Sequence, residues 1–229
     1  IIIINPEQIL VFFYILLKML FIIIIITCIF SIKGFKDLTF FNKYKFHIQS
    51  IKKGEKYRMW SSAFLHADYS HLFFNLFTLW VFSGAILMQL GEFYYVIIYS
   101  LSLYFGNFFT LKQHKNEVLY SAVGASGAVT GIVYSSILLF PEMKLALLFF
   151  PVPLPSYVFG LCYILYSIYG MKKNTGNIGH SAHLGGAIAG MIITILIKPS
   201  ILIDQTWLVL LLLTPFLILY YDKKNSLFR

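Results

Sequence analysis

Seven runs of apolar residues follow one another along this chain of 229 residues, and each is close to the length that crosses a lipid bilayer. A membrane-spanning helix needs about 17–25 residues, because the hydrocarbon core is about 30 Å thick and a helix rises about 1.5 Å per residue. Backbone polar groups find no water in that core, so such runs are expected to be helices. The predicted spans are residues 10–32, 71–90, 93–111, 119–140, 156–171, 180–197 and 206–221. The pattern therefore predicts an all-α integral membrane protein.

Composition agrees with this class and not with a soluble domain. Hydrophobic residues make up 59% of the chain, charged residues 12%, and the mean hydropathy is +0.79. The connections between spans are short and no internal repeat is evident. We therefore predict one membrane domain over residues 1–229, with a first loop at 31–70, core helices at about 10–198 and an extra helix at about 206–221. Because the chain opens on Ile1 rather than Met, we expect that residues precede it.

Charge and cysteine content limit the function further. The chain carries 18 Lys and Arg against 9 Asp and Glu, which gives a net charge of +9. Nothing in it resembles a nucleic-acid-binding module, so we predict no nucleic-acid partner and interpret the excess as loop charge that meets anionic membrane lipid. Cys28 and Cys162 lie in predicted spans without disulfide or metal-ligand spacing. They are expected to be small core residues, and we predict no metal site and no cofactor.

The connections also carry information. Lys18, inside the first run, is expected to extend its amine to the nearer interface. The first loop holds eight Lys and Arg with aromatic residues between them, so we expect it to be partly ordered on the membrane surface, with His66 forming hydrogen bonds. A run of three prolines predicts a kinked interfacial connection at residues 144–155.

Polar side chains are costly in hydrocarbon and usually face a protein interior or a wet cavity, and three groups of them occur in the spans. His71 and Asn75 of "HLFFN" are four residues apart, hence on one face of the second helix. Ser126 of "GASG" lies near the start of the fourth helix, and His180 and His183 of "GHSAHLGG" lie near the start of the sixth. Helices two, four and six cross in the same direction, so their starts share one membrane face. The spacing thus permits one shared site without proving it.

Glycines provide a reason for the fourth and sixth helices to approach each other. Gly127 and Gly131 are four residues apart on the fourth helix, and Gly186 and Gly190 are four apart on the sixth. Small residues at this spacing let membrane helices pack closely. Alone they usually indicate packing. Here each pair lies within one turn of a polar residue named above, which favours a functional contact.

A hydroxyl and an imidazole on the same membrane face suggest nucleophilic catalysis, because a serine becomes reactive when a neutral histidine accepts its proton. All nine acidic residues fall in loops or at span ends, so a dyad of Ser126 and His183 fits better than a triad. The oxyanion would be held by backbone N–H groups at the helix start, including that of Ser126, with His71 and Asn75 as side-chain donors. The alternatives are that Ser126 is a small packing residue and His183 a hydrogen-bonded buried histidine. We interpret His180 as structural.

The three motifs, in this order on alternate spans, resemble the rhomboid family of intramembrane serine proteases. Each motif alone is weak, whereas the ordered set is specific and extends from the first helix to the sixth. The resemblance implies a rhomboid-like six-helix bundle, to which the helix at 206–221 is an addition, and it is strongest to bacterial members. It implies that Ser126 is the nucleophile and His183 the general base, and that His71 and Asn75 help to hold the oxyanion.

Further positions follow from the same resemblance. "EKYRMWSSAFLH" is similar to the family's first-loop signature of an aromatic residue and an arginine: Arg58 matches, and Tyr57 replaces the usual tryptophan. Thr130 stands where the family often has an aromatic residue that packs under the histidine, so something else must hold His183. Four glycines are predicted to be structural residues near the site: Gly124, Gly127, Gly186 and Gly190.

Other membrane classes fit less well. A transporter would show midplane charges and often an internal repeat, a zinc protease would need a motif such as H-E-x-x-H, and an aspartyl protease would need two carboxylates within spans. The remaining alternative is a catalytically inactive rhomboid-like protein that binds transmembrane helices, but such proteins usually lack the serine or the histidine. We therefore predict a serine-type endopeptidase whose partners are transmembrane protein substrates.

We expect a multi-pass protein of the bacterial inner membrane. The resemblance puts the N-terminus in the cytoplasm and the first loop outside. That arrangement leaves most Lys and Arg outside, against the positive-inside rule. The resemblance and the loop charges thus predict opposite orientations.

Overall fold

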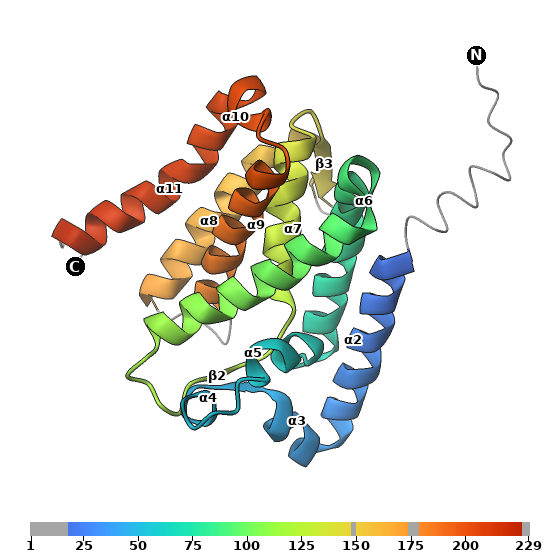
Figure 1. Ribbon diagram of the computed structural model, residues 1–229, viewed down its shortest axis with the longest axis vertical. Helices are drawn as coiled ribbons and strands as arrows, with labels where there is room; N and C mark the ends of the chain where they lie inside the picture. Colours follow the sequence, from blue (N-terminus) through green and yellow to red (C-terminus); the bar gives the residue numbers. More distant parts are fainter. Residues whose placement is uncertain (1–17, 148–149, 174–178, 226–229) are drawn as a thin grey trace, which may run out of the picture.

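The long apolar runs form helices in the computed structural model, which describes residues 18–147, 150–173 and 179–225. The bundle in Figure 1 is built from α2 (Lys18–Lys36), α6 (Tyr69–Gln113), α7 (Ser126–Leu139), α8 (Ser156–Lys173), α9 (His180–Ile197) and α11 (Thr206–Asn225). Within the described residues, α2, α6 and α9 are long and apolar enough to cross a membrane, while α7 and the apolar part of α11 are shorter. The predicted all-α membrane class is confirmed.

Helix α6 contains the second and third predicted spans as a hairpin. Its backbone leaves helical geometry at Gly91, where φ is 80° and ψ is 175°, a combination that is essentially restricted to glycine. The hydroxyls of Ser83 and Tyr95 lie 3.0 Å apart and link the two arms beyond this bend. Asp68 caps the first arm by accepting the N–H of His71 at 2.7 Å.

The first loop folds into short elements at one end of the bundle, which we call the loop end and which lies at the bottom of Figure 1. They are α3 (Leu38–Tyr44), β1 (Phe46–His47), α4 (Ile48–Lys52), α5 (Arg58–Ser61) and the 3₁₀ helix η1 (Ser62–Phe64). Strand β1 pairs antiparallel with β2 (Ser121–Ala122), just before α7. A small core forms beneath them from Phe46, Ile48, Ile51 and Met59. The loop is therefore an ordered structure that contacts the chain leading into α7.

Helix α7 runs through the interior of the bundle, since every residue from 127 to 139 is buried. Helix α9 packs directly on it. A Cβ added at Gly186 would overlap the carbonyl oxygen of Gly127, and one added at Gly190 would overlap that of Gly131. Because the paired numbers rise together, α7 and α9 run in the same direction and start at the same end. The close glycine contact predicted from the sequence is thus a backbone-to-backbone contact.

Two segments contain short strands in the structure, and one of them changes a predicted helix boundary. Helix α7 begins at Ser126 rather than at residue 119, because the chain is extended through β2 and then turns at Gly124, whose φ is 123°. The connection at 144–155 contains a ladder, in which β3 (Lys144–Leu147) pairs antiparallel with β4 (Phe150–Pro155). Apolar residues occur in extended segments as well as in helices. The hydrophobicity of the run that begins at residue 119 therefore did not show where the helix itself begins.

Smaller differences concern the ends and surfaces of helices. The part of the first predicted span before Lys18 lies outside the described residues, and α2 continues from there to Lys36. Cys162 is exposed on α8, so it is not the core residue that we expected, whereas Cys28 is half-buried. Helix α10 (Ile201–Asp204) joins α9 to α11, which packs against α8 on the outside of the bundle (Figure 1).

Candidate functional site

A cavity of about 500 Å³ lies between α6, α7, α8 and α9, close to the loop end. Ser126, His183, His71 and Asn75 all line it. Apolar side chains such as Phe74 complete the wall. The structure thus brings together, from three helices, the four side chains that the sequence singled out.

Ser126 is the first residue of α7 and is half-buried. A helix of 14 residues is about 21 Å long, shorter than the roughly 30 Å hydrocarbon core. The chain before it is extended at β2, which pairs with β1 of the first loop. The first N–H groups of a helix lack partners within the helix and form the positive end of its dipole. The start of α7 is therefore suited to stabilising negative charge next to the Ser126 hydroxyl.

Gly124 brings the chain against His71. Its positive φ favours glycine, and an added Cβ would lie 2.9 Å from both Cε1 and Nε2 of the His71 ring. Any side chain here would push the imidazole away from the start of α7. Of the predicted structural glycines near the site, Gly124 thus faces the ring of a cavity residue.

His71 and Asn75 are both oriented as hydrogen-bond donors. The N–H of Ala67 donates to His71 Nδ1 over a long 3.5 Å, so the neutral ring carries its hydrogen on Nε2, the atom that faces Gly124. The Asn75 amide donates one hydrogen to the His71 carbonyl at 3.0 Å, which leaves its second hydrogen for the cavity. Both residues of the cavity wall thus retain an N–H donor.

His183 is only 5% exposed and is held from α8. Its Nδ1 lies 3.0 Å from the Tyr163 hydroxyl and 3.4 Å from that of Ser167, so Nε2 is left for another partner. Within the described chain, no hydrogen bond joins His183 to the Ser126 hydroxyl. Such bonds are often long in enzymes without substrate and shorten in the complex. Tyr163 was not predicted; the one signal for such a residue was the lack of an aromatic side chain at position 130.

His66 links α2 to the residue before Ser126. Its Nε2 accepts the N–H of Ala125 at 3.4 Å, so its hydrogen is on Nδ1, which lies 2.9 Å from the Ser31 hydroxyl. Ser31 in turn donates to the Phe64 carbonyl at 2.9 Å. Burial, with a smaller contribution from His71, lowers the pKa of His66 to about 3, which keeps the ring neutral. The hydrogen bonding expected of His66 therefore supports the segment that leads into α7.

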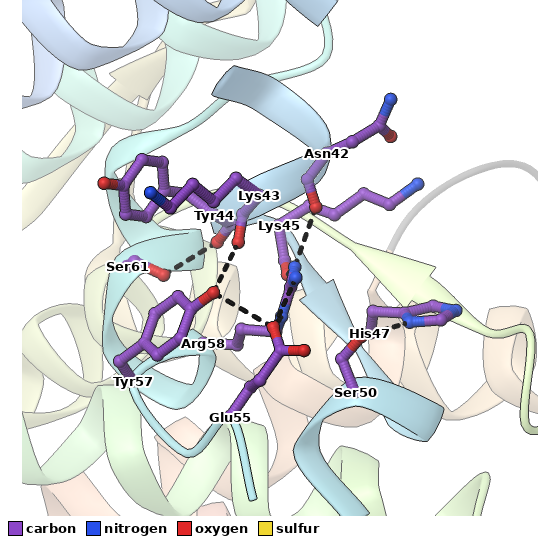
Figure 2. A network of polar contacts seen from close by, with 10 residues as sticks. All are labelled: Asn42, Lys43, Tyr44, Lys45, His47, Ser50, Glu55, Tyr57, Arg58 and Ser61. Atoms are coloured by element: carbon purple, nitrogen blue, oxygen red, sulfur yellow. Dashed lines mark hydrogen bonds and ion pairs between the residues drawn. The ribbon is translucent and has the colours of Figure 1, made fainter. Parts of the chain in front are cut away.

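Arg58 anchors the first loop, as Figure 2 shows. The side chain is 8% exposed and donates to the carbonyls of Asn42 and Lys45 at 2.8 and 2.9 Å. It also donates to the Glu55 carboxylate at 2.7 Å and so lowers the pKa of that group. Since β1 follows Lys45 and pairs with β2, the backbone of the loop connects Arg58 to the chain that leads into α7.

Tyr57 occupies the position where a tryptophan was expected, and its hydroxyl takes part in the same network. It lies 3.1 Å from the Lys43 carbonyl and 3.0 Å from Glu55. Ser61 adds a bond to the Tyr44 carbonyl at 2.7 Å. The exchange of tryptophan for tyrosine therefore leaves the loop with a polar anchor (Figure 2).

Other candidate groups do not join the site. His180 is 4% exposed, meets the Tyr166 ring edge-on at 5.4 Å between centroids and packs on Gly170, which fits a structural role. Asp68 lines the cavity, but its carboxylate caps α6. Among the described residues, no three His, Cys, Asp or Glu side chains lie together as a metal ion would require.

Comparison with known proteins adds an independent observation. Residues 53–200, which include all four cavity residues above, match the family description Rhomboid domain. The chain is 32% identical over 134 residues to rhomboid protein 1, mitochondrial, of Saccharomyces cerevisiae, an alignment that covers 57% of this chain and 39% of that protein.

Two further relatives extend the comparison. RHOMBOID-like protein 12, mitochondrial, of Arabidopsis thaliana is 30% identical over 166 residues, which are 66% of this chain and 49% of the relative. The putative rhomboid protease YdcA of Bacillus subtilis is 29% identical over 157 residues, 64% of this chain and 69% of the relative. The chain thus spans less than half of the two mitochondrial relatives.

Proposed function

Because the chain belongs to the rhomboid family, we propose that it is an intramembrane serine endopeptidase that hydrolyses peptide bonds in or near transmembrane segments of other membrane proteins. The observation that supports this most is the shared cavity, which is lined by a hydroxyl, an imidazole and two candidate oxyanion donors. A packing serine and a structural histidine would not need such a common cavity.

In the proposed reaction, the Ser126 hydroxyl attacks the carbonyl carbon of the scissile peptide while His183 Nε2 accepts its proton. The carbonyl oxygen becomes an oxyanion, held by the Ser126 N–H and by donors from His71 and Asn75. The C–N bond then breaks as His183 returns the proton to the leaving amine, which gives an acyl-enzyme. A water that loses its proton to His183 then attacks the ester carbon. The bond from that carbon to the Ser126 oxygen breaks as His183 returns the proton to the serine, and the acid product leaves.

The substrates in this proposal are transmembrane proteins, because the cavity lies among membrane helices. Membrane lipid contacts the outer surface, and no nucleic-acid partner is proposed. The bacterial inner membrane is proposed as the location. The Bacillus subtilis relative favours that location, whereas the other two relatives named above are mitochondrial proteins.

The proposal is tested by treating the purified full chain with a fluorophosphonate probe and, separately, with a reporter transmembrane substrate. The wild-type chain should be labelled and should cleave the reporter. Ser126→Ala and His183→Ala should lose both properties, while His114→Ala, a histidine change outside the cavity, should keep both. His180→Ala should keep substantial activity. A wild-type chain that is neither labelled nor active would refute the proposal.

The second candidate is an inactive rhomboid-like protein that binds transmembrane helices, because the match to the Rhomboid domain family does not itself distinguish the two functions. The same experiment separates the two. An inactive binder would retain the reporter helix, for example in a co-purification, without cleaving it or reacting with the probe.

A further inference from the structure

His183 can act as a base only if its free nitrogen points at Ser126, and some group must hold the ring in that orientation. A buried carboxylate commonly does this in serine proteases, yet the groups on Nδ1 here are two hydroxyls. Tyr163 is the nearer at 3.0 Å, against 3.4 Å for Ser167. Because a base must accept at Nε2, Nδ1 carries the hydrogen and the tyrosine oxygen accepts it.

Tyr163 also fixes the plane of the ring. The two aromatic rings are stacked with centroids 5.3 Å apart and planes inclined by 29°. The hydrogen bond limits rotation of the imidazole within its plane, and the stacking limits tilt out of it. One side chain therefore restrains both motions that would turn Nε2 away from the serine.

The hydroxyl of Tyr163 is connected onward to the nucleophile. Thr130 Oγ1 lies 2.7 Å from the Ser126 carbonyl oxygen and 3.5 Å from the Tyr163 hydroxyl. A carbonyl can only accept, so the Thr130 hydroxyl is the donor to Ser126. Thr130 is also the donor in the longer 3.5 Å contact with the Tyr163 oxygen. Polar contacts therefore run from His183 through Tyr163 and Thr130 to the backbone of Ser126.

We propose that Tyr163 of α8 is a positioning residue, which selects the tautomer and orientation of His183 and ties them through Thr130 to the first turn of α7. This inference rests on the proposed protease function. It explains how position 130 can be a threonine: the aromatic support for the histidine comes from another helix, and the threonine is the link. As His183 gains a proton, its Nδ1–H becomes a charged donor, and the bond to Tyr163 strengthens.

The test compares Tyr163→Phe with wild type, since phenylalanine keeps the ring and removes only the hydroxyl. We expect kcat and the rate of fluorophosphonate labelling to fall together by about 10- to 100-fold, as for loss of one hydrogen bond to a charged group. KM for the reporter and the melting temperature should change little. Tyr169→Phe, an exposed tyrosine on the same helix, is the matched control and should behave as wild type.

Thr130→Val should give a smaller loss, and the double variant with Tyr163→Phe should lose less than the product of the two single effects. Thr130→Ser keeps the hydroxyl, so it should retain most of the activity that Thr130→Val loses. Full activity of Tyr163→Phe in a chain whose Ser126 reacts with the probe would overturn the positioning role while leaving the proposed function intact.

A measurement that needs no activity completes the test. In chain labelled with ¹⁵N-histidine, the imidazole signals of His183 should report the Nδ1–H tautomer in wild type and a mixture of tautomers in Tyr163→Phe. Identical signals in the two would overturn the proposal, even if the wild-type chain proved to be inactive.

Discussion

The contact between α7 and α9 predicts a large effect of Gly186→Val. The added Cβ would lie 2.7 Å from the carbonyl carbon of Gly127, where ordinary contact begins at 3.4 Å. The obstructing atoms belong to the backbone, so no side-chain rotation relieves the clash. The two helices must separate by at least the difference of about 0.7 Å, and the branched valine adds to it.

A separation near 1 Å moves His183 relative to Ser126, and a displacement of that size costs about a hundredfold in a positioned reaction. Overpacking of a tight contact also destabilises a protein by about 1–3 kcal/mol. We therefore expect turnover and fluorophosphonate labelling to fall together by about a hundredfold, with a lower melting temperature. Gly186→Ala should show the same changes to a lesser degree.

Gly84→Val is the control, because no atom lies within 4 Å of an added Cβ at that position of α6. Gly160 of α8 also lies outside the contact between α7 and α9, but it is a less suitable control. An added Cβ there would lie 2.7 Å from Ile137 Cδ1, which is the flexible end of a side chain. If Gly186→Val were fully active in a folded sample, direct backbone contact would not be what assembles the site.

Three further predictions concern the oxyanion, the loop and the orientation. Asn75→Ala should slow turnover by about 10²–10³ while Ser126 still reacts with the probe; unchanged turnover would remove Asn75 from the site. The pKa of His66 is lowered to about 3 in the folded chain, against an ordinary 6.5. As the pH falls from about 6.5 towards 3, only the unfolded chain gains a proton at this residue. The free energy of unfolding should therefore decrease over that range. His66→Gln should flatten this part of the profile of melting temperature against pH, and an unaltered slope would count against a neutral buried ring. A cysteine at the exposed Lys53, in a chain without its two native cysteines, should react with an impermeant maleimide in intact cells if the first loop is outside; protection would show the orientation that the loop charges favour.

Much of the helical layout could be predicted because apolar runs end where polar residues begin. The sixth span was expected at residues 180–197, and α9 is His180–Ile197. The parallel approach of α7 and α9 followed from the number of crossings and from the spacing of the glycines. These features depend on local composition and on the count of membrane crossings, which sets the direction of each helix. Both can be read from the sequence.

What could not be predicted depends on long-range geometry. The segment before Ser126 belongs to an apolar run, yet it is not helical, because Ser121–Ala122 form β2, which pairs with β1 from the first loop. Tyr163 meets His183 only because α8 has one particular rotation and depth beside α9. His66 forms hydrogen bonds with both Ala125 and Ser31, and the three residues belong to three separate segments of the chain. No local pattern marks such contacts.

The late arrival of α9 has a consequence for how the bundle is made. The chain is synthesised from its N-terminus at about 5–20 residues per second, so His183 follows Ser126, 57 positions earlier, by roughly 3–11 seconds. Until then α7 has no glycine face to pack against, although every residue from 127 to 139 is buried in the finished bundle. Tyr163 of α8 is already made in that interval, but the proposed base His183 is not. In the proposed mechanism, completion of the bundle is therefore what supplies the base, and a nascent chain that stops before α9 contains Ser126 without its proposed partner His183.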